Sequence, residues 1–169
     1  MPRLRDQHGQ SWPWPPLAPA GEQAEGFLIP DAGPVASGAS VASPAPLAWI
    51  VFLPGAFTPV CTRELGWMQE LSAGLSERSV ALRVVSCDPA PVLRAVADDL
   101  GLTVPLLSDF WPHGAAAQLL GEFDAESGRA LRSSVLMDTA GTVLHRVHAA
   151  PGEERTPGQH LDHHVHAAG

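Results

Sequence analysis

Two kinds of hydrophobic pattern alternate along the middle of the chain. A continuous apolar run at 47–53 is followed by Pro54 and Gly55 and predicts a buried strand. The next apolar residues recur every three or four positions, as they do on one face of a helix. They are Leu65, Met68, Leu71 and Leu75.

The same alternation continues along the rest of the chain, with turn residues between the apolar segments. The predicted elements are a strand at 80–86, a helix from Pro89 to Gly101, a strand at 104–107, a helix at 112–120, a turn at 124–129, a hairpin of strands 131–137 and 143–148, and a short helix within 156–168. This order predicts an α/β fold with a central mixed sheet flanked by helices. A thioredoxin-like arrangement satisfies the order, as do other small α/β folds.

The first 46 residues follow different patterns. Residues 1–14 predict a hairpin of two short strands with Gly9 in the turn. From 13 to 46 the composition shifts to Pro, Ala, Gly and Ser, which predicts a flexible segment with a short strand at 27–29. The length of 169 residues predicts a single domain over 1–169.

Charge and hydropathy exclude several classes of partner. The formal net charge is −8, and all ten basic residues are arginine, so neither a nucleic acid nor an anionic membrane is an expected partner. The longest apolar stretch, 47–57, is broken by Pro54 and is too short to span a bilayer. No apolar segment follows the first arginines as in a signal peptide, so a soluble, cytoplasmic protein with free thiols is expected.

Cys61 is the residue with the most distinctive surroundings. It follows the buried strand and a proline-rich loop and falls in the first turn of the predicted helix. The unsatisfied N–H groups and partial positive charge at a helix N-terminus favour a thiolate, the nucleophilic form of cysteine. Thr58, three residues earlier, has a hydroxyl that can hydrogen-bond to the sulfur or to a bound peroxide. Considered alone, such a cysteine is more often a small buried side chain.

The spacing Pro54-x-x-x-Thr58-x-x-Cys61 resembles the active-site motif of the peroxiredoxin family, and Glu64 extends the match. The stretch 105–114 resembles the one-cysteine alkyl hydroperoxide reductase E subgroup of actinobacteria. The resemblance covers 47–155, with a weaker match at 4–10. The family usually begins with a longer strand region containing Ala-Pro-Asp-Phe, so this start is expected to be truncated or to lack that element.

The resemblance implies a thioredoxin-like fold and a thiol-dependent peroxidase. Hydrogen peroxide and organic hydroperoxides would be reduced through a sulfenic acid on Cys61. Thr58 and Arg132 would align the peroxide and stabilise developing charge, and Pro54 would shield the sulfur. Arg132 is assigned because it lies where the family has its active-site arginine. No metal or other cofactor is implied, the reductant is an external thiol or a redoxin, and a homodimer is expected.

Cys87 is the second cysteine, and it follows the strand at 80–86. It is not in a C-x-x-C pair with Cys61, and the position of a resolving cysteine five residues after Cys61 is Gly66. A bystander role and a one-cysteine cycle are therefore predicted. A redox sensor or chaperone that uses the same oxidisable cysteine is the alternative function. A disulfide oxidoreductase is disfavoured because Thr58 stands where its first cysteine belongs, and a binding module would give the motif no purpose.

Three further groups receive structural interpretations. Glu64 is expected to act as an ordinary acid in the first turn of a helix. His113 is expected to pack near the site or at a subunit contact. His160 and His164 have the i, i+4 spacing that can bind zinc or nickel, but their tail is short and terminal, so no metal site is predicted.

Overall fold

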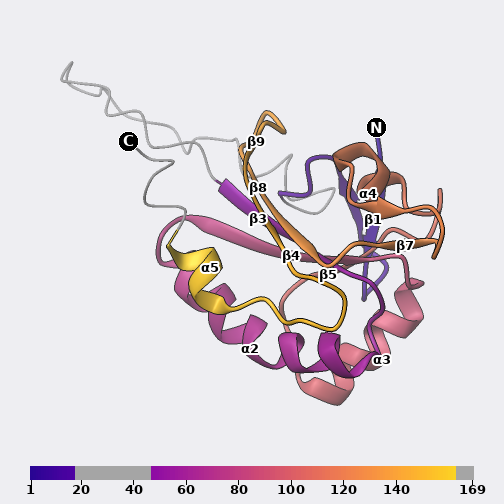
Figure 1. The fold of residues 1–169 in the computed structure, drawn as a ribbon, viewed down its shortest axis with the longest axis horizontal. Helices are drawn as coiled ribbons and strands as arrows, with labels where there is room; N and C mark the ends of the chain where they lie inside the picture. The colour runs from indigo at the N-terminus through magenta and orange to yellow at the C-terminus, as the bar shows by residue number, and fades with distance from the viewer. Residues whose placement is uncertain (18–46, 163–169) are drawn as a thin grey trace, which may run out of the picture.

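A seven-stranded sheet forms the centre of the computed structural model, which describes residues 1–17 and 47–162 (Figure 1). In spatial order the strands are β2 (Ser11–Pro13), β1 (Arg3–Asp6), β5 (Leu106–Ser108), β4 (Val80–Ser86), β3 (Leu47–Leu53), β8 (Ser133–Met137) and β9 (Val143–His148). Strands β3, β4 and β5 are parallel, whereas β1, β2, β8 and β9 pair antiparallel with their neighbours. The predicted mixed sheet is therefore confirmed.

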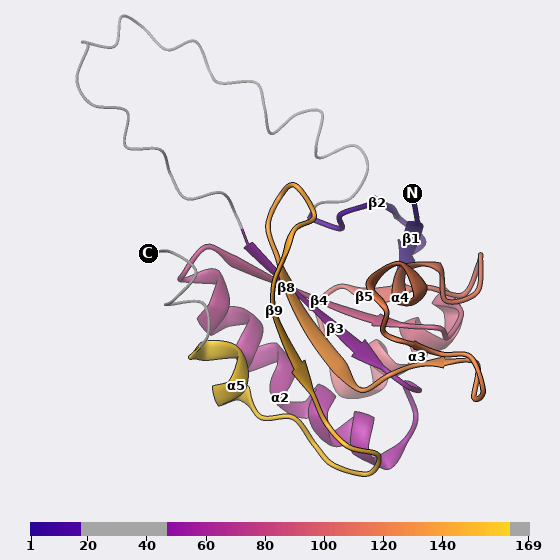
Figure 2. The same cartoon turned by 45° about the horizontal axis from the view of Figure 1, so that its top comes forward.

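Helices cover the two faces of this sheet unequally (Figures 1 and 2). One face carries α2 (Pro59–Ser76), α3 (Ala90–Leu100) and α5 (Pro157–Leu161), which pack on one hydrophobic cluster. The other face carries α4 (Ala115–Leu120) and a small hairpin of β6 (Phe123–Asp124) and β7 (Arg129–Ala130), over a second cluster. Within the two described ranges, no helix combines the length and apolar character needed to cross a membrane.

Strand β3 is apolar at every position because both of its faces are covered by other parts of the protein. Successive side chains of a strand point to opposite faces of the sheet. Trp49 and Val51 therefore join the cluster under α2 and α3, whereas Ile50 and Phe52 join the cluster on the opposite face. All four side chains are fully buried, as expected for a central strand with both faces covered.

The parallel pairing of β3, β4 and β5 brings three connections to one edge of the sheet. Their carboxyl ends meet there, and each is followed by a loop or turn, at 54–58, 87–89 and 109–114. Ligands of open α/β sheets commonly bind at this edge. The loop at 54–58 leads directly into α2, so the edge carries Cys61.

The strand predicted at 131–137 begins at Ser133. Two other predicted boundaries differ from the structure because side chains replace backbone partners. The helix predicted at 112–120 begins only at Ala115, since Gly114 has a φ of 69° and the Asp109 carboxylate accepts hydrogen bonds from the N–H groups of the first turn. Strand β5 spans 106–108 instead of 104–107, because Gln7 bonds the backbone of this segment with its side-chain amide.

The N-terminal prediction is confirmed in part. The hairpin is formed by β1 and β2, and Gly9 has a φ of 84° in its turn. Residues 13–17, the start of the segment predicted to be flexible, include the last residue of β2, and the Arg83 guanidinium donates hydrogen bonds to Pro16 O and Leu17 O. The predicted strand at 27–29 and the rest of that segment to residue 46 lie outside the described residues.

Candidate active site

Cys61 is the third residue of α2, and the cap of that helix fixes its position. Thr58 is the N-cap, with extended φ and ψ of −75° and 149°, and Pro59 occupies the first helical position, where its missing N–H costs nothing. The Thr58 hydroxyl donates to Gly55 O at 3.1 Å and accepts from the N–H of Cys61 at 3.4 Å. The residue type and the three-residue spacing together place a threonine hydroxyl beside the cysteine.

Arg132 reaches the sulfur from the neighbouring strand, on the face of the sheet that α2 covers. It directly precedes β8, the antiparallel neighbour of β3, and its Nη2 donates a hydrogen bond to Cys61 Sγ at 3.3 Å. Cys61 is fully buried and Arg132 is only 9% exposed. A buried guanidinium that donates to sulfur is complementary to a thiolate.

Glu64 forms an ion pair with Arg132, and the sequence did not predict this contact. Its carboxylate is fully buried and accepts a hydrogen bond from Arg132 Nη1 at 2.6 Å. The expectation of an ordinary first-turn acid is therefore wrong. Arg155, from the loop before α5, completes the cluster by donating its backbone N–H and its Nε to Glu64 Oε1 and its Nη2 to Oε2.

These contacts determine the charge of the buried carboxylate. Burial alone would raise the pKa of Glu64, but the hydrogen bonds and charge of Arg155, together with the charge of Arg132, lower it below its ordinary value. Glu64 is therefore an anion at neutral pH, set between two guanidinium groups. Arg155 is fully enclosed by protein, so this carboxylate is its counter-charge.

The cluster of Glu64, Arg132 and Arg155 is connected to α5 through the hydroxyl of Ser134, a residue of β8. Arg155 Nη1 donates to Ser134 Oγ at 3.1 Å, and that hydroxyl lies 2.8 Å from His160 Nε2. His160 is fully buried, its other ring nitrogen lies 2.8 Å from Thr156 O, and its ring packs edge-on to Trp49. The His160 ring thus joins α5 to the core. The other tail histidines, at 163, 164 and 166, lie outside the described residues.

Cys87 lies at the same edge of the sheet but in a different electrostatic environment. It is 9% exposed and is not in a disulfide. Burial and the nearby charge of Asp109 raise the pKa of its thiol to about 11, so this thiol is neutral at physiological pH. A neutral thiol is a poor nucleophile, which supports the prediction that Cys87 is a bystander.

Two hollows lie beside Pro54, and each is lined by a residue that is hydrogen-bonded to Cys61, although Cys61 itself lines neither. The first, of about 400 Å³, is lined by Thr58, Cys87 and His113 among others. The second, of about 390 Å³, has Arg132 in its wall. Pro54 lines both, and His113 is held by a 2.7 Å hydrogen bond between its Nε2 and Gly128 O. Each hollow has room for a small organic molecule.

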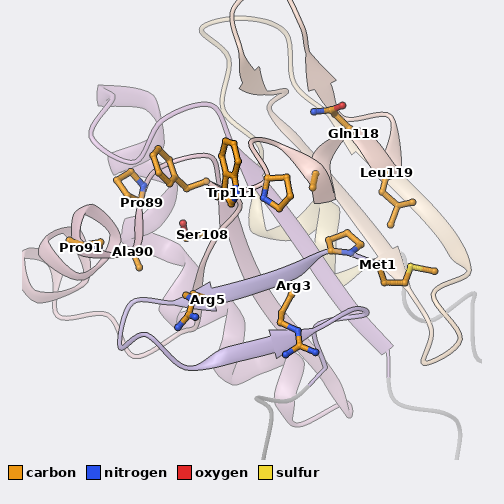
Figure 3. Close-up of a pocket in the computed structure, with 14 residues that line it drawn as sticks. Met1, Arg3, Arg5, Pro89, Ala90, Pro91, Ser108, Trp111, Gln118 and Leu119 are labelled. Atoms are coloured by element: carbon orange, nitrogen blue, oxygen red, sulfur yellow. The ribbon is translucent and has the colours of Figure 1, made fainter.

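A third cavity, of about 1070 Å³, is lined by none of the residues that contact Cys61. Figure 3 shows Pro89 and Trp111 on one side of it and Arg3 and Arg5, both on β1, across from them. None of the predicted catalytic residues lines it. The candidate site is therefore assigned by the contacts of Cys61 and not by cavity size.

Among the four predicted site residues, Thr58, Cys61 and Arg132 are joined by hydrogen bonds, and Pro54 lines the hollows in front of them. Glu64 and Arg155 are additional members. Arg155 carries no local sequence signal, because its partner Glu64 lies 91 positions earlier.

Comparisons with known proteins show which family and which proteins this chain is similar to. The model of the AhpC/TSA family matches residues 31–146. Alkyl hydroperoxide reductase E from Mycobacterium tuberculosis and the same-named protein from Mycobacterium bovis are each 37% identical over 106 residues, covering 63% of this chain and 69% of the relative.

Solved structures have a similar fold. AhpC from Enterococcus faecalis superposes with a TM-score of 0.64 at 32% identity, over 72% of this chain and 74% of that one. Peroxidoxin BcpB from Mycobacterium tuberculosis superposes with a TM-score of 0.65 over 95% of this chain and 86% of that one, at 22% identity.

Proposed function

The chain belongs to the AhpC/TSA family of peroxiredoxins, and from this membership we propose that it reduces hydroperoxides through a sulfenic acid on Cys61. Its fold is the thioredoxin-like α/β fold of that family, and the protein is a peroxiredoxin enzyme with peroxidase activity. The observation that carries the proposed mechanism is the 3.3 Å hydrogen bond from Arg132 to the sulfur of Cys61, at the capped start of α2.

The oxidative step begins with attack by the Cys61 thiolate on the terminal oxygen of the hydroperoxide. An S–O bond forms as the O–O bond breaks, and the departing alkoxide or hydroxide takes a proton and leaves as alcohol or water. Negative charge moves from sulfur to the two oxygens. In this proposal the Arg132 guanidinium and the first-turn N–H groups hold that charge, and the Thr58 hydroxyl, whose hydrogen is directed at Gly55 O in the structure, turns to donate to the peroxide.

Glu64 and Arg155 act as positioning residues in this proposal. One guanidinium nitrogen of Arg132 is anchored on Glu64, which leaves Nη2 directed at the sulfur. Arg155 in turn holds both carboxylate oxygens of Glu64. The Arg132 side chain is thus fixed in one orientation before the peroxide binds. Because the guanidinium need not move during the reaction, it can stabilise the charge of the transition state at little cost in free energy.

The reducing half of the cycle depends on an external thiol or a redoxin. A thiolate attacks the sulfenic sulfur, the hydroxyl leaves as water, and a second thiol releases Cys61 from the mixed disulfide. The neutral state of Cys87 supports this one-cysteine cycle. Free thiols fit a reducing compartment, so we place the protein in the cytoplasm.

Turnover measurements test the proposal. The purified protein should consume hydrogen peroxide and tert-butyl hydroperoxide continuously with at least one member of a panel of thiols and redoxins. Cys61→Ser should abolish that consumption and Cys87→Ser should preserve it. Full activity of Cys61→Ser would refute the assignment, whereas oxidation by one equivalent without turnover would instead favour a redox sensor.

We also propose a homodimer. Large apolar side chains are exposed around the cavity of about 1070 Å³, with Trp111 81% exposed and Phe110 and Leu119 each about half exposed. Contiguous exposed apolar surface of this kind marks an interaction site. Light scattering should give a dimer mass for the wild type and a monomer mass for Trp111→Arg, whereas the control Leu144→Arg, on exposed strand β9, should remain dimeric. A monomeric wild type would contradict the proposal.

A further inference from the structure

Arg129 lines both of the hollows beside Pro54. It begins β7 and is exposed, and it lines the cavity that contains Thr58 as well as the cavity that contains Arg132. A small molecule bound in either hollow therefore shares its cavity with Arg129 and with a residue that is hydrogen-bonded to Cys61. Among residues 1–17 and 47–162, no ion pair or side-chain hydrogen bond of the Arg129 guanidinium is found.

The neighbouring acids are engaged elsewhere. Asp124 lies opposite Arg129 in the hairpin, but its carboxylate accepts hydrogen bonds from the backbone of the turn, at Glu126 N and Ser127 N. Asp88, in the first hollow, accepts from the N–H of Ala56 and from a serine hydroxyl. Arg129 thus retains its hydrogen-bonding capacity for a ligand.

The sign of the charge around the second hollow differs from that of the protein as a whole. Its wall contains Arg129 and Arg132, and Asp124 is the only acid among the residues that line it. The chain carries a net charge of −8, so an anion is disfavoured over most of the surface. A guanidinium binds a carboxylate through two parallel hydrogen bonds, which a neutral group cannot reproduce.

We propose that Arg129 is a specificity-determining residue that favours thiols bearing a carboxylate as the reductants of oxidised Cys61. The inference rests on the proposed function. The carboxylate binds Arg129 while the thiolate sulfur attacks the sulfenic sulfur of Cys61. One S–S bond forms, the S–O bond breaks, and the hydroxyl leaves with a proton as water.

Three small thiols of similar size but different charge test this proposal. In a Cys87→Ser background, Cys61 is first oxidised with one equivalent of tert-butyl hydroperoxide, which is neutral. The oxidised protein is mixed with 3-mercaptopropionate, 2-mercaptoethanol or cysteamine, quenched with acid, and analysed by mass spectrometry for the mixed disulfide. The quantity compared is the ratio of the rate constants for the anionic and neutral thiols, because intrinsic reactivity cancels between variants.

Arg129→Gln should lower this ratio by about three- to fivefold, the effect expected for loss of one exposed ion pair. Arg129→Glu should lower it further and favour cysteamine. Arg78→Gln, which removes an exposed arginine from the turn after α2, should leave the ratio unchanged. The Arg129→Gln effect should also shrink in 1 M salt, since exposed charges are screened.

Two results would overturn the proposal: the same ratio in the Cys87→Ser protein with and without Arg129→Gln, or a sulfenic acid in the Cys87→Ser protein that none of the three thiols reduces. Failure of the proposed function is recognised separately. In that case tert-butyl hydroperoxide would leave Cys61 unoxidised in the first step, before any thiol is added.

Discussion

Replacement of Glu64 by glutamine keeps the shape of the side chain and removes its charge. In the wild type, the two carboxylate oxygens accept four hydrogen bonds, and every donor belongs to an arginine. Each oxygen faces two donors, so the amide NH₂ of glutamine opposes N–H groups in either orientation. Arg132 and Arg155 then remain buried without an anion between them.

The expected cost follows from that burial. Breaking a buried ion pair by removing one partner costs about 3–5 kcal/mol, because the remaining charge stays desolvated. The loss is a large fraction of the roughly 5–15 kcal/mol that stabilises an ordinary domain. Asp98→Asn is the matched control, because Asp98 pairs with Arg94 on the surface of α3 and both side chains are more than half exposed. That change should cost less than about 1 kcal/mol.

Urea denaturation followed by circular dichroism measures both changes, and pH adds a second test. The lowered pKa of Glu64 means that its contribution is fully present above its ordinary value of 4.5 and is lost as the pH falls through the folded-state pKa. The stability difference between wild type and Glu64→Gln should therefore be constant near neutral pH and narrow below about pH 4.5. A cost equal to that of Asp98→Asn at pH 7 would refute the reasoning.

Three further predictions concern the same edge of the sheet. Thr58→Val should slow Cys61 oxidation by at least about tenfold in stopped-flow measurements, whereas Thr58→Ser should retain most of the rate, since only the hydroxyl bonds Gly55 and Cys61. In Cys61→Ser protein, alkylation of Cys87 by iodoacetamide should stay slow at neutral pH and accelerate towards about pH 11; a fast reaction at pH 7 would contradict its raised pKa. Asp109→Asn should lower the pKa of Cys87, because it removes a nearby negative charge, and should weaken the first turn of α4 by about 1 kcal/mol in thermal unfolding.

Local patterns predicted much of the fold and one part of the site. The apolar run of β3 and the spacing of Leu65, Met68, Leu71 and Leu75 predicted the strand and helix on either side of the loop. Thr58 and Cys61 were predicted together because they are only three residues apart, although the hydroxyl was expected to bond the sulfur or a peroxide and in the structure it caps the helix at Cys61 N.

Long-range contacts account for what local patterns missed. Arg132 is 71 positions from Cys61 and was assigned only through the family resemblance. Glu64 was predicted to be an ordinary acid in the first turn of a helix, because no neighbouring residue in the sequence indicates that two distant arginines contact its carboxylate. The start of α4 was placed three residues early because the Asp109 carboxylate that caps it belongs to the preceding loop.

The role of Cys61 in the chemistry is tested most directly by trapping its oxidised form. The reduced protein is mixed with one equivalent of hydrogen peroxide in the presence of dimedone, and the modified residue is located by mass spectrometry of its peptides. The structure predicts stoichiometric loss of peroxide with one dimedone adduct on Cys61 and none on Cys87, and a strongly slowed reaction in Arg132→Gln. Peroxide consumption that leaves Cys61 unmodified, or that proceeds equally fast in Arg132→Gln, would contradict the mechanism.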